Sequence, residues 1–565
     1  MSLVKRGPVS LVEQQPVDIC RTPHGSVLVD FGKVAFGNLS VKWPPGFDGK
    51  AVLHFGEALS NGCVDRAPPG TVRYARVEAD AGKGSVVAPP PDAKNTRPVA
   101  VATPPEWGVL IPFRWVELEG WPEEAALDLA QTRRRAAFAR DWNDDASAFT
   151  CSDPLLTKIW DLSRYSIKAT TFAGVYVDGD RERIAYEGDA YLNQISHQAC
   201  DPDPTIARAT FDYLLQHPTW PTEWALHMPF MAHADWMHTG DRSWLTSRYD
   251  SLLPKLLPER LRTDGLLMSP PALKDRDLVD WPRTERDGYV FTDVNAVVNA
   301  FYIEALKRMS VLAAAIGRQE EAGSLRARAA AATTVFHSTF LDESRRLFVD
   351  GVGTDHASQH ANFFPLAFNL VPGRSRKGVL DHVLERGMAC SVYGAQYLLE
   401  ALFLHGKAEA ALALMTASGD RSWRHMLESG ATITWEAWDH RYKPNLDWNH
   451  AWGAAPANLL PRYVAGVRVD GAGGSRIAVQ PETGGLRYCS ARIPTMRGPV
   501  EIEWSKDTTF RLCLAMPSGM AARLILPAAG RHQVRLNGQT ITPRQWRGRL
   551  VLPGRRVGTI ELTVG

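Results

Sequence analysis

A short stretch of the chain, residues 177–189, carries the residue types that acid–base chemistry needs. It holds five carboxylates and two arginines within thirteen residues, and apolar and aromatic side chains are frequent on both sides of it. Carboxylates held among apolar walls acquire separated pKa values, so that two of them can divide the work of an acid and a base. The alternative is a surface loop with internal ion pairs, which is the common fate of charged residues.

A second stretch, far downstream, favours the chemical interpretation. Glu436 lies between Trp435 and Trp438, and His450 and Trp452 follow closely. Tryptophan faces stack on the C–H faces of sugar rings, and neighbouring polar groups bind the hydroxyls. A carboxylate in such a wall can activate a water molecule. The alternative is the aromatic end of a core helix, but 10 of the 18 tryptophans fall between residues 200 and 460, and this clustering favours a sugar-binding cleft.

Length and charge limit the class of protein. A chain of 565 residues is expected to form two to four domains. The 64 basic and 62 acidic residues give a net charge of +2 without a block of like charge, so neither nucleic acid nor an anionic membrane is an expected partner. No apolar run is long enough to span a bilayer, and no apolar segment follows the charges of residues 1–6 as in a signal peptide. We therefore expect a cytoplasmic location, or a periplasmic one if a signal peptide has been removed.

The cysteines point to neither a disulfide framework nor a metal. Seven of them are dispersed along the chain without close paired spacing, which suits reduced thiols. No Cys/His spacing resembles a zinc site. We expect no metal and no cofactor.

The two ends of the chain read as β-structure. Short alternating runs separated by Gly and Pro predict a β-sandwich over residues 1–147 and a second one over residues 466–565. Residues 88–105, rich in proline, read as a loop or an insertion. The clearest predicted strands are 27–31, 39–43, 51–55, 113–120, 474–481, 500–504, 522–527 and 558–564.

The middle of the chain, residues 148–465, reads as helical. The predicted helices are 154–163, 295–315, 324–340, 376–386 and 396–404. Long loops with aromatic residues join them, and long ordered loops in a compact domain are usually functional. Helices in successive pairs, with the functional loops on one face, predict an (α/α)6 toroid.

This order of regions resembles the bacterial α-L-rhamnosidases of glycoside hydrolase family 78, which are six-hairpin glycosidases. Residues 181–189 are similar to the family's Arg-Glu-Arg-x-Gly-Trp-x-Gly-Asp element, residues 434–439 to its Trp-Glu-x-Trp-Asp element, and residues 449–453 to its Asn-His element. The chain departs from the pattern at several positions. The family's Cys-Pro is absent before the first arginine, Ala185 and Tyr186 replace Gly-Trp, and Glu187 replaces a small polar residue.

The resemblance implies an inverting glycosidase that releases terminal α-L-rhamnose, with Glu182 as the general acid and Glu436 as the general base. It also implies a substrate-binding loop formed by residues 280–281 and 286–289. Together with the residue types, it predicts a carbohydrate-binding set of Asp178, Arg181, Tyr186, Asp189, Asp280, Trp281, Trp435, Trp438 and His450.

Inverting chemistry makes physical demands on these residues. The acid and the base must lie roughly 6.5–9.5 Å apart so that a water molecule fits between them. A general acid also needs a raised pKa, which burial against Tyr186 or the neighbouring Glu187 could supply. A nearby arginine would have the opposite effect. We therefore expect Arg181 or Arg183 to point towards another carboxylate, namely Asp178, Asp180 or Asp189.

Alternative functions remain open at this point. Glu187 could be the acid in place of Glu182. Another toroid sugar enzyme could act on a different deoxy sugar or on a uronic acid, and a lyase could use Tyr186 with Arg181 and Arg286. A carbohydrate-binding protein without catalysis belongs to a different class, and the carboxylates Glu182 and Glu436 argue against it.

Overall fold

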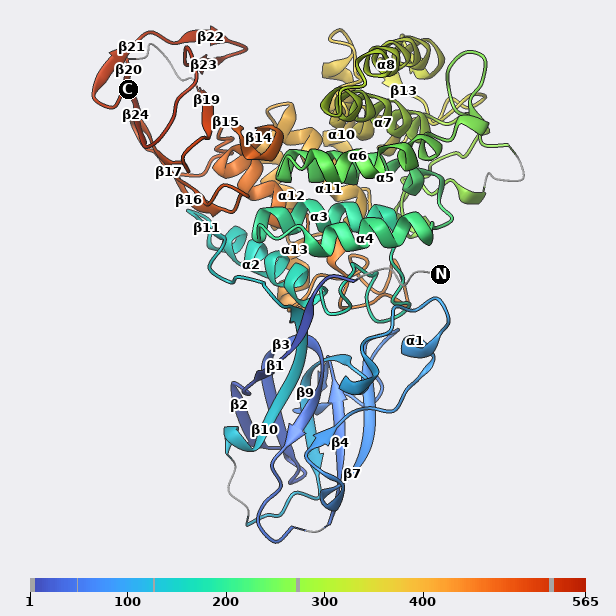
Figure 1. The fold of residues 1–565 in the computed structure, drawn as a ribbon, viewed down its shortest axis with the longest axis vertical. Coiled ribbons are helices and arrows are strands. Elements are labelled where there is room, and N and C mark those ends of the chain that lie inside the picture. Colours follow the sequence, from blue (N-terminus) through green and yellow to red (C-terminus); the bar gives the residue numbers. More distant parts are fainter. Residues whose placement is uncertain (1–5, 48, 125–127, 271–274, 528–532) are drawn as a thin grey trace.

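Three regions follow one another in the computed structural model, which describes residues 6–47, 49–124, 128–270, 275–527 and 533–565. In Figure 1 the N-terminal β region lies at the bottom and the helical region lies above it. The C-terminal β region lies beside the helices at the upper left. Residues 1–5, on which the expectation about a signal peptide mostly depends, lie outside the described ranges. Within these ranges, no helix has the length and apolar character needed to cross a membrane.

Most strands of the N-terminal β region form one antiparallel sheet with the strand order β1-β10-β3-β9-β4-β7, in which β2 and β8 both pair with β3. The short strands β5 Leu59–Ser60 and β6 Cys63–Val64 form a separate pair. Two predicted strands, 27–31 and 39–43, are parts of one long strand. They remain continuous because Gly32, at φ 77°, lies in an irregularity of the β3–β9 ladder. The strands are β1 Val9–Gln14, β2 Asp18–Arg21, β3 Val27–Val41, β4 Lys50–Gly56, β7 Tyr74–Asp80, β8 Val86–Val87, β9 Ile111–Glu119 and β10 Thr132–Ala139. The loop over residues 88–105 contains the short helix α1, Ala93–Thr96.

This sheet has a hydrophobic core of its own. Alternate residues such as Val27, Val29 and Phe31 on β3 meet Leu53 and Phe55 on β4 in a buried cluster separate from the core of the helices. A period of two places these side chains on one face of the sheet. The sheet is therefore joined to the helical region through other contacts, several of which are polar and belong to the site described below.

Every helical run predicted from the sequence forms a helix. Helix α7 packs against α8 and α5, and α5 packs against α3. The helices are α2 Pro154–Ala169, α3 Glu187–Cys200, α4 Thr205–Gln216, α5 Thr222–Thr239, α6 Arg242–Leu252, α7 Ala296–Ala315, α8 Gln319–Phe340, α9 His360–Ala367, α10 Arg376–Arg386, α11 Val392–Leu404, α12 Ala408–Thr416, α13 Trp423–Glu428 and α14 Ala455–Leu459.

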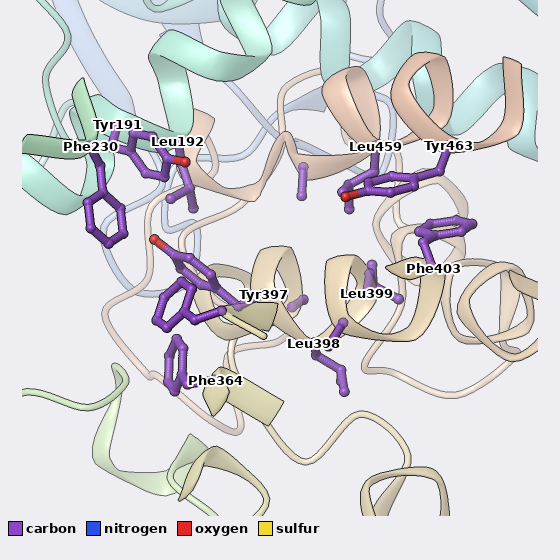
Figure 2. Packing of buried hydrophobic residues seen from close by; sticks show 14 of the residues in the cluster. Tyr191, Leu192, Phe230, Phe364, Tyr397, Leu398, Leu399, Phe403, Leu459 and Tyr463 are labelled. Atoms are coloured by element: carbon purple, nitrogen blue, oxygen red, sulfur yellow. The ribbon is translucent and has the colours of Figure 1, made fainter. Parts of the chain in front are cut away.

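Aromatic side chains from four helices hold this region together (Figure 2). Tyr191 of α3 meets Phe230 of α5 edge-on at 5.4 Å between ring centroids, and Phe364 of α9 lies 5.1 Å from Tyr397 of α11. Offset and edge-on aromatic pairs contribute about 0.5–1.5 kcal/mol each beyond the burial of their area. These contacts fix the helices relative to one another, and so fix the loops that lead into them.

The C-terminal β region contains two sheets. Their strand orders are β11-β16-β17-β18-β24-β20-β21 and β14-β15-β19-β23-β22. Strand β11, directly after the predicted boundary at residue 147, pairs with β16 and so belongs to this region. The strands are β11 Ala148–Cys151, β14 Val467–Gly471, β15 Arg476–Val479, β16 Tyr488–Ile493, β17 Val500–Lys506, β18 Phe510–Ala515, β19 Ala521–Pro527, β20 Val534–Leu536, β21 Gln539–Ile541, β22 Arg544–Trp546, β23 Arg549–Val551 and β24 Ile560–Val564.

The C-terminal sheets share the large hydrophobic core of the helices, whereas the first sheet meets the helical region in smaller apolar clusters such as that of Phe36 with Phe172. Val500, Leu512 and Leu562 belong to the same buried cluster as the helical aromatics. Trp504 of β17 is buried and donates a hydrogen bond to the carbonyl oxygen of Val464 at 2.9 Å. This β region is thus attached mainly by apolar packing.

Candidate active site

A cavity of about 180 Å³ brings together segments that are far apart in the sequence. We call residues 178–189 its upstream wall and residues 436–452 its downstream wall. Aromatic and apolar residues from positions 220–224 and 278–281 close the space between the two walls. The lining residues are Asp178, Arg181, Glu182, Tyr186, Asp189, Trp220, Pro221, Trp224, Leu278, Trp281, Glu436, His450 and Trp452.

The upstream wall comprises the end of the loop between α2 and α3 and the first residues of α3. Residues 447–449 of the downstream wall hold it in place. Gly179 has a φ of 111°, and a Cβ atom there would lie 2.9 Å from the carbonyl oxygen of Asn449. Only glycine allows this close approach. The backbone N–H groups of Asp180 and Arg181 then donate to the side-chain oxygens of Asn449 and Asp447, both at 2.8 Å. The two walls are therefore fixed to each other through the backbone.

Arg181 connects the two predicted catalytic carboxylates. Its Nη1 donates to Oε1 of Glu182 and its Nη2 donates to Oε1 of Glu436, both at 2.7 Å. Arg183 behaves as predicted, because its buried guanidinium turns away to Asp180 at 2.6 Å. The prediction that at least one of the arginines pairs with another carboxylate is thus confirmed by Arg183.

The titration of Glu182 differs from the prediction. Burial would raise its pKa, but the charge of Arg181 and hydrogen bonds from Asp178 and Tyr186 outweigh the burial and hold the pKa below its ordinary value. The pKa of Asp178 is instead raised well above the ordinary value, by burial and by the charge of Glu182. Two adjacent carboxylates cannot both ionise easily, so the proton of this pair is held on Asp178.

Two further residues of the upstream segment have different surroundings. The Tyr186 hydroxyl donates to Oε2 of Glu182 at 3.2 Å and faces the cavity. Glu187, the alternative acid, is buried and accepts hydrogen bonds from the backbone and the hydroxyl of Thr219. It is not among the lining residues, because it begins α3 and its side chain points to the neighbouring loop.

Glu436 of the downstream wall is only 2% exposed and is held on several sides. One oxygen faces Arg181, and the other lies 3.2 Å from Nζ of Lys443 and accepts the backbone N–H of Asp447 at 3.1 Å. The backbone carbonyl of Glu436 accepts the indole N–H of Trp452 at 2.9 Å. These contacts leave the carboxylate little rotational freedom.

Asp189 and His450 face each other across the cavity, with His450 Nε2 3.6 Å from Oδ1 of Asp189. Burial raises the pKa of Asp189 well above its ordinary value, and the charges of Glu436 and Glu182 add to the rise. The pKa of His450 is lowered well below its ordinary value by burial and by the charge of Arg181. These shifts favour the neutral form of both groups, in which each can donate and accept hydrogen bonds to a sugar hydroxyl.

The N-terminal sheet reaches the downstream wall with polar side chains. The Thr71 hydroxyl donates to Oδ1 of Asp447 at 2.7 Å, and Glu57 accepts a hydrogen bond from Nδ2 of Asn449 at 3.0 Å. Burial raises the pKa of Asp447 to about 7, and the charge of Glu436 contributes to the rise. Nε of Arg73 lies 3.4 Å from Oδ2 of Asp180, under the upstream wall. These positions carry no local motif, so no pattern in the sequence indicates that they belong to the site.

Three residues of the predicted substrate-binding set do not line the cavity. Trp438 is fully buried and donates to the carbonyl oxygen of Cys390 at 2.7 Å, and Trp435 is 3% exposed and stacks on Trp448. Asp280 is also fully buried, and accepts the backbone N–H of Trp281 at 2.8 Å. The physical reason is that residues 434–439 form an irregular loop in which adjacent side chains point in different directions, so that Glu436 faces the cavity while its neighbouring tryptophans enter the core.

The cavity wall also uses aromatic residues outside the two charged motifs. Trp220 and Trp224 both line the cavity. Trp220 is 47% exposed at its edge, whereas Trp224 is 2% exposed. Trp452 lines it as well. Within the described ranges, no group of three or more His, Cys, Asp or Glu side chains is arranged to hold a metal ion.

Comparison with known proteins agrees with this arrangement. Residues 144–464 match the family described as the bacterial alpha-L-rhamnosidase 6 hairpin glycosidase domain, and residues 466–540 match the bacterial alpha-L-rhamnosidase C-terminal domain. An alpha-L-rhamnosidase of Alteromonas sp. (strain LOR) is 22% identical over 96% of this chain and 60% of its own length. One from Formosa agariphila is 21% identical over 76% of this chain and 48% of its own length. The chain thus spans about half to three fifths of these relatives.

Solved structures share the fold. The alpha-L-rhamnosidase from Dictyoglumus thermophilum covers 99% of this chain at a TM-score of 0.80 with 19% identity, and 64% of its own chain is matched. The Streptomyces avermitilis alpha-L-rhamnosidase complexed with L-rhamnose covers 99% of this chain at a TM-score of 0.79 with 18% identity, and 54% of its own chain is matched. The helical region and its flanking β regions are thus the fold of rhamnosidases. Since the first family model matches more than half of the chain, the protein belongs to the bacterial alpha-L-rhamnosidase six-hairpin glycosidase family.

Proposed function

We propose that the cavity hydrolyses terminal α-L-rhamnosides with inversion, using Glu182 as the general acid and Glu436 as the general base. The observation that carries this proposal is the guanidinium of Arg181, which binds both carboxylates at 2.7 Å within one cavity. Two carboxylates bound to the two terminal nitrogens of one guanidinium face the same cavity, and inverting enzymes keep their acid and base ~6.5–9.5 Å apart on either side of the scissile bond.

The acid step follows from the pair formed by Asp178 and Glu182. An acid must carry its proton when the glycosidic oxygen departs, and the raised pKa of Asp178 keeps a proton in this pair at neutral pH. Glu182 is the more exposed of the two, with 24% of its side chain accessible, so it delivers the proton to the leaving oxygen. Glu182 receives this proton from Asp178 through their shared hydrogen bond as the leaving oxygen departs, and the pair regains a proton from solvent afterwards.

The base step uses the fixed position of Glu436. Its carboxylate takes a proton from a water molecule as that water attacks the anomeric carbon from the side opposite to the leaving group. Lys443, Arg181 and the backbone of Asp447 hold the carboxylate while the charge redistributes. Groups that do not reorganise during the reaction contribute most to catalysis.

The remaining lining residues suit a deoxy sugar. Asp189, His450 and the Tyr186 hydroxyl offer hydrogen bonds to ring hydroxyls, whereas Trp224, Leu278, Trp281 and Trp452 supply apolar surface. A methyl group in place of a hydroxymethyl group favours such an apolar wall. The Streptomyces avermitilis relative is described as complexed with L-rhamnose, which supports a carbohydrate of this kind as the substrate.

The proposal includes the domain organisation. We assign residues 1–147 to an N-terminal β-sandwich domain, residues 148–465 to an (α/α)6 catalytic toroid, and residues 466–565 to a C-terminal β-sandwich domain. The separate buried cluster of the first sheet and the packing of α3, α5, α7 and α8 on one another support this division, although strand β11 (Ala148–Cys151) pairs across the boundary with the C-terminal sheet.

Product stereochemistry tests the proposal. The protein should release p-nitrophenol from p-nitrophenyl α-L-rhamnoside, and proton NMR during the first minutes should show β-L-rhamnose before mutarotation. An α product would contradict inversion. If the protein instead cleaves other p-nitrophenyl sugars or uronate oligosaccharides, rhamnose is the wrong substrate. If it binds rhamnose without any turnover, it is a carbohydrate-binding protein and not an enzyme.

A further inference from the structure

A second cavity, of about 340 Å³, lies where the C-terminal β region meets the helices. Four arginines contribute to its wall, together with a histidine and a tryptophan, and none of its described lining residues is acidic. The residues that define it are Arg376, His405, Arg468, Trp546, Arg547 and Arg549. We call it the arginine cavity.

The arginine cavity is separate from the candidate active site. His405 follows the C-terminal end of α11, whereas Ser391 at the other end of that helix contacts Asp280, the residue beneath Trp281 of the active-site wall. A helix of 13 residues is about 20 Å long at 1.5 Å per residue. The two cavities therefore lie at opposite ends of the same helix and share no lining residue.

A β-hairpin supplies one side of the arginine cavity. Strands β22 and β23 are joined by Arg547 and Gly548, which have φ values of 49° and 72°. Positive φ at both central residues is the geometry of a tight two-residue hairpin turn. The turn places Trp546, 46% exposed, beside the guanidinium of Arg547, which lies 4.8 Å from the centre of the tryptophan ring.

The positive charges of the cavity are only partly compensated. Arg549 pairs with Glu482, and Arg468 donates to the amide oxygen of Gln480 at 2.9 Å. Arg376 and Arg547 have no ion-pair partner among the described residues, and the buried Nε of Arg376 has no hydrogen-bond acceptor there. Burial, together with the charges of Arg376 and Arg547, lowers the pKa of His405.

This excess of charge is unfavourable unless an anion offsets it. Like charges close together repel, and the repulsion grows where burial limits screening by solvent. A guanidinium is a planar fork that matches the oxygens of a carboxylate or a sulfate group. Arg547 lies over the ring of Trp546, but the side chain is still 46% exposed, so ring surface remains for the C–H face of a sugar. A cavity of this size is within the range of about 300–1,000 Å³ that small-molecule sites occupy.

We propose that the arginine cavity binds an anionic sugar unit, bearing a carboxylate or a sulfate group, of an acidic polysaccharide. The arginines bind the anionic group, and Trp546 stacks on the ring. This binding is independent of the proposed hydrolysis, because the cavity shares no residue with the active-site walls. It holds an acidic polysaccharide against the protein while the other end of α11 carries the candidate active site.

Calorimetric titration of the full chain tests the proposal. Trigalacturonate is the carboxylate probe, a sulfated dextran oligosaccharide is the sulfate probe, and maltotriose is the neutral control. The wild type should bind at least one of the two anionic probes with saturation and should not bind maltotriose. Arg376→Gln and Trp546→Ala should each weaken that binding about tenfold, since each removes one of the two contacts.

Arg544→Gln is the matched control. Arg544 lies on the same hairpin, is exposed and does not line the cavity, so its substitution removes the same charge and should leave the affinity within about twofold. Unaltered affinity in Arg376→Gln, equal binding of maltotriose, or binding of neither anionic probe would overturn the proposal. If inorganic sulfate binds as tightly as the probes and Trp546→Ala has no effect, the site binds a free anion and the sugar part of the proposal is overturned.

Discussion

The two walls of the candidate active site hold their carboxylates in different ways. On the upstream wall, Glu182 is 24% exposed on its side chain and shares a proton with the buried Asp178. On the downstream wall, Glu436 is 2% exposed and is held by Arg181, Lys443 and a backbone N–H group. One wall thus presents a carboxyl group with a second carboxyl group behind it, and the other presents a carboxyl group held in one position.

This difference matches the two tasks of an inverting hydrolase. A general acid must lose a proton and recover it, which a coupled pair allows, whereas a general base must aim one charge at one water molecule. The N-terminal β region supports both walls but contacts different groups in each. Arg73 lies 3.4 Å from Asp180 of the upstream wall, whereas Thr71 and Glu57 bind Asp447 and Asn449 of the downstream wall. The comparison therefore predicts different consequences for substitutions on each side.

Removal of the Glu436 carboxyl group should have the largest effect. Glu436→Gln keeps the shape of the side chain but cannot accept a proton from water, so kcat should fall about 10³-fold or more for every leaving group. The measurement is kcat for p-nitrophenyl α-L-rhamnoside and for a rhamnoside with an alkyl leaving group. Glu428→Gln, an exposed glutamate paired with Arg424, is the control and should retain activity. Full activity in Glu436→Gln would exclude this residue as the base.

On the upstream wall, the effect should depend on the leaving group. Glu182→Gln should reduce kcat/KM about 10²–10³-fold for an alkyl rhamnoside, because an alkoxide needs a proton to depart. The loss should be several-fold smaller for p-nitrophenyl rhamnoside, whose leaving group is stable as an anion. Comparison of the two substrates gives the ratio directly. Equal losses for both would mean that Glu182 does not donate the proton, and the contrast between the walls would fail.

Asp178→Asn tests the proton pair through pH. A general acid is active below its pKa and inactive above it, and the raised pKa of Asp178 keeps the pair protonated to higher pH. With asparagine at position 178, only Glu182 remains, and Arg181 holds its pKa below the ordinary value. The alkaline limb of the kcat/KM profile should therefore move to lower pH, with activity at pH 7 about 10–100-fold lower. An unchanged limb in Asp178→Asn, with Asp145→Asn as the surface control, would show that the pair does not supply the proton.

Much of the fold could be predicted from periodicity. The helical runs and most strands appear where the hydrophobic patterns place them, since burial of one face leaves a period of 3.6 or 2 in the sequence. The two charged motifs at residues 181–189 and 434–439 also identified segments that meet at one cavity. Both signals are local, and local signals survive in a single sequence.

The details that were missed depend on contacts between distant residues. Thr71 and Asp447 are 376 residues apart, and no pattern connects them. The side-chain directions of Trp435 and Trp438 depend on an irregular loop, so their burial could not be read from spacing. The pKa of Glu182 is lowered mainly because the side chain of Arg181 points towards it. The sequence alone does not determine whether Arg181 or Arg183 faces this carboxylate.

The support from the N-terminal sheet should have a moderate effect. Thr71→Val keeps the shape of the side chain but removes the hydrogen bond to Asp447, which is hydrogen-bonded to Glu436 through the backbone. We expect kcat to fall about three- to tenfold with little change in KM, because a displaced base lowers the rate more than binding. Thr132→Val is the control, since the hydroxyl of Thr132 is buried without a partner among the described residues. Equal kcat in both variants would mean that the sheet does not support the downstream wall.

The smallest effect should come from the edge of the cavity, between the two walls. Trp220 lines the cavity but remains 47% exposed, so it contacts the part of a substrate beyond the reacting sugar. Trp220→Ala should raise KM about two- to fivefold for a rhamnoside with an aromatic leaving group and leave kcat nearly unchanged, since a stacking contact made equally before and during the reaction affects only binding. Tyr488→Ala, with the same 47% exposure on β16 far from the cavity, should change neither constant. A fall in kcat for Trp220→Ala would instead place this tryptophan against the reacting sugar. The residues between the two walls would then take part in the chemical step as well as in binding.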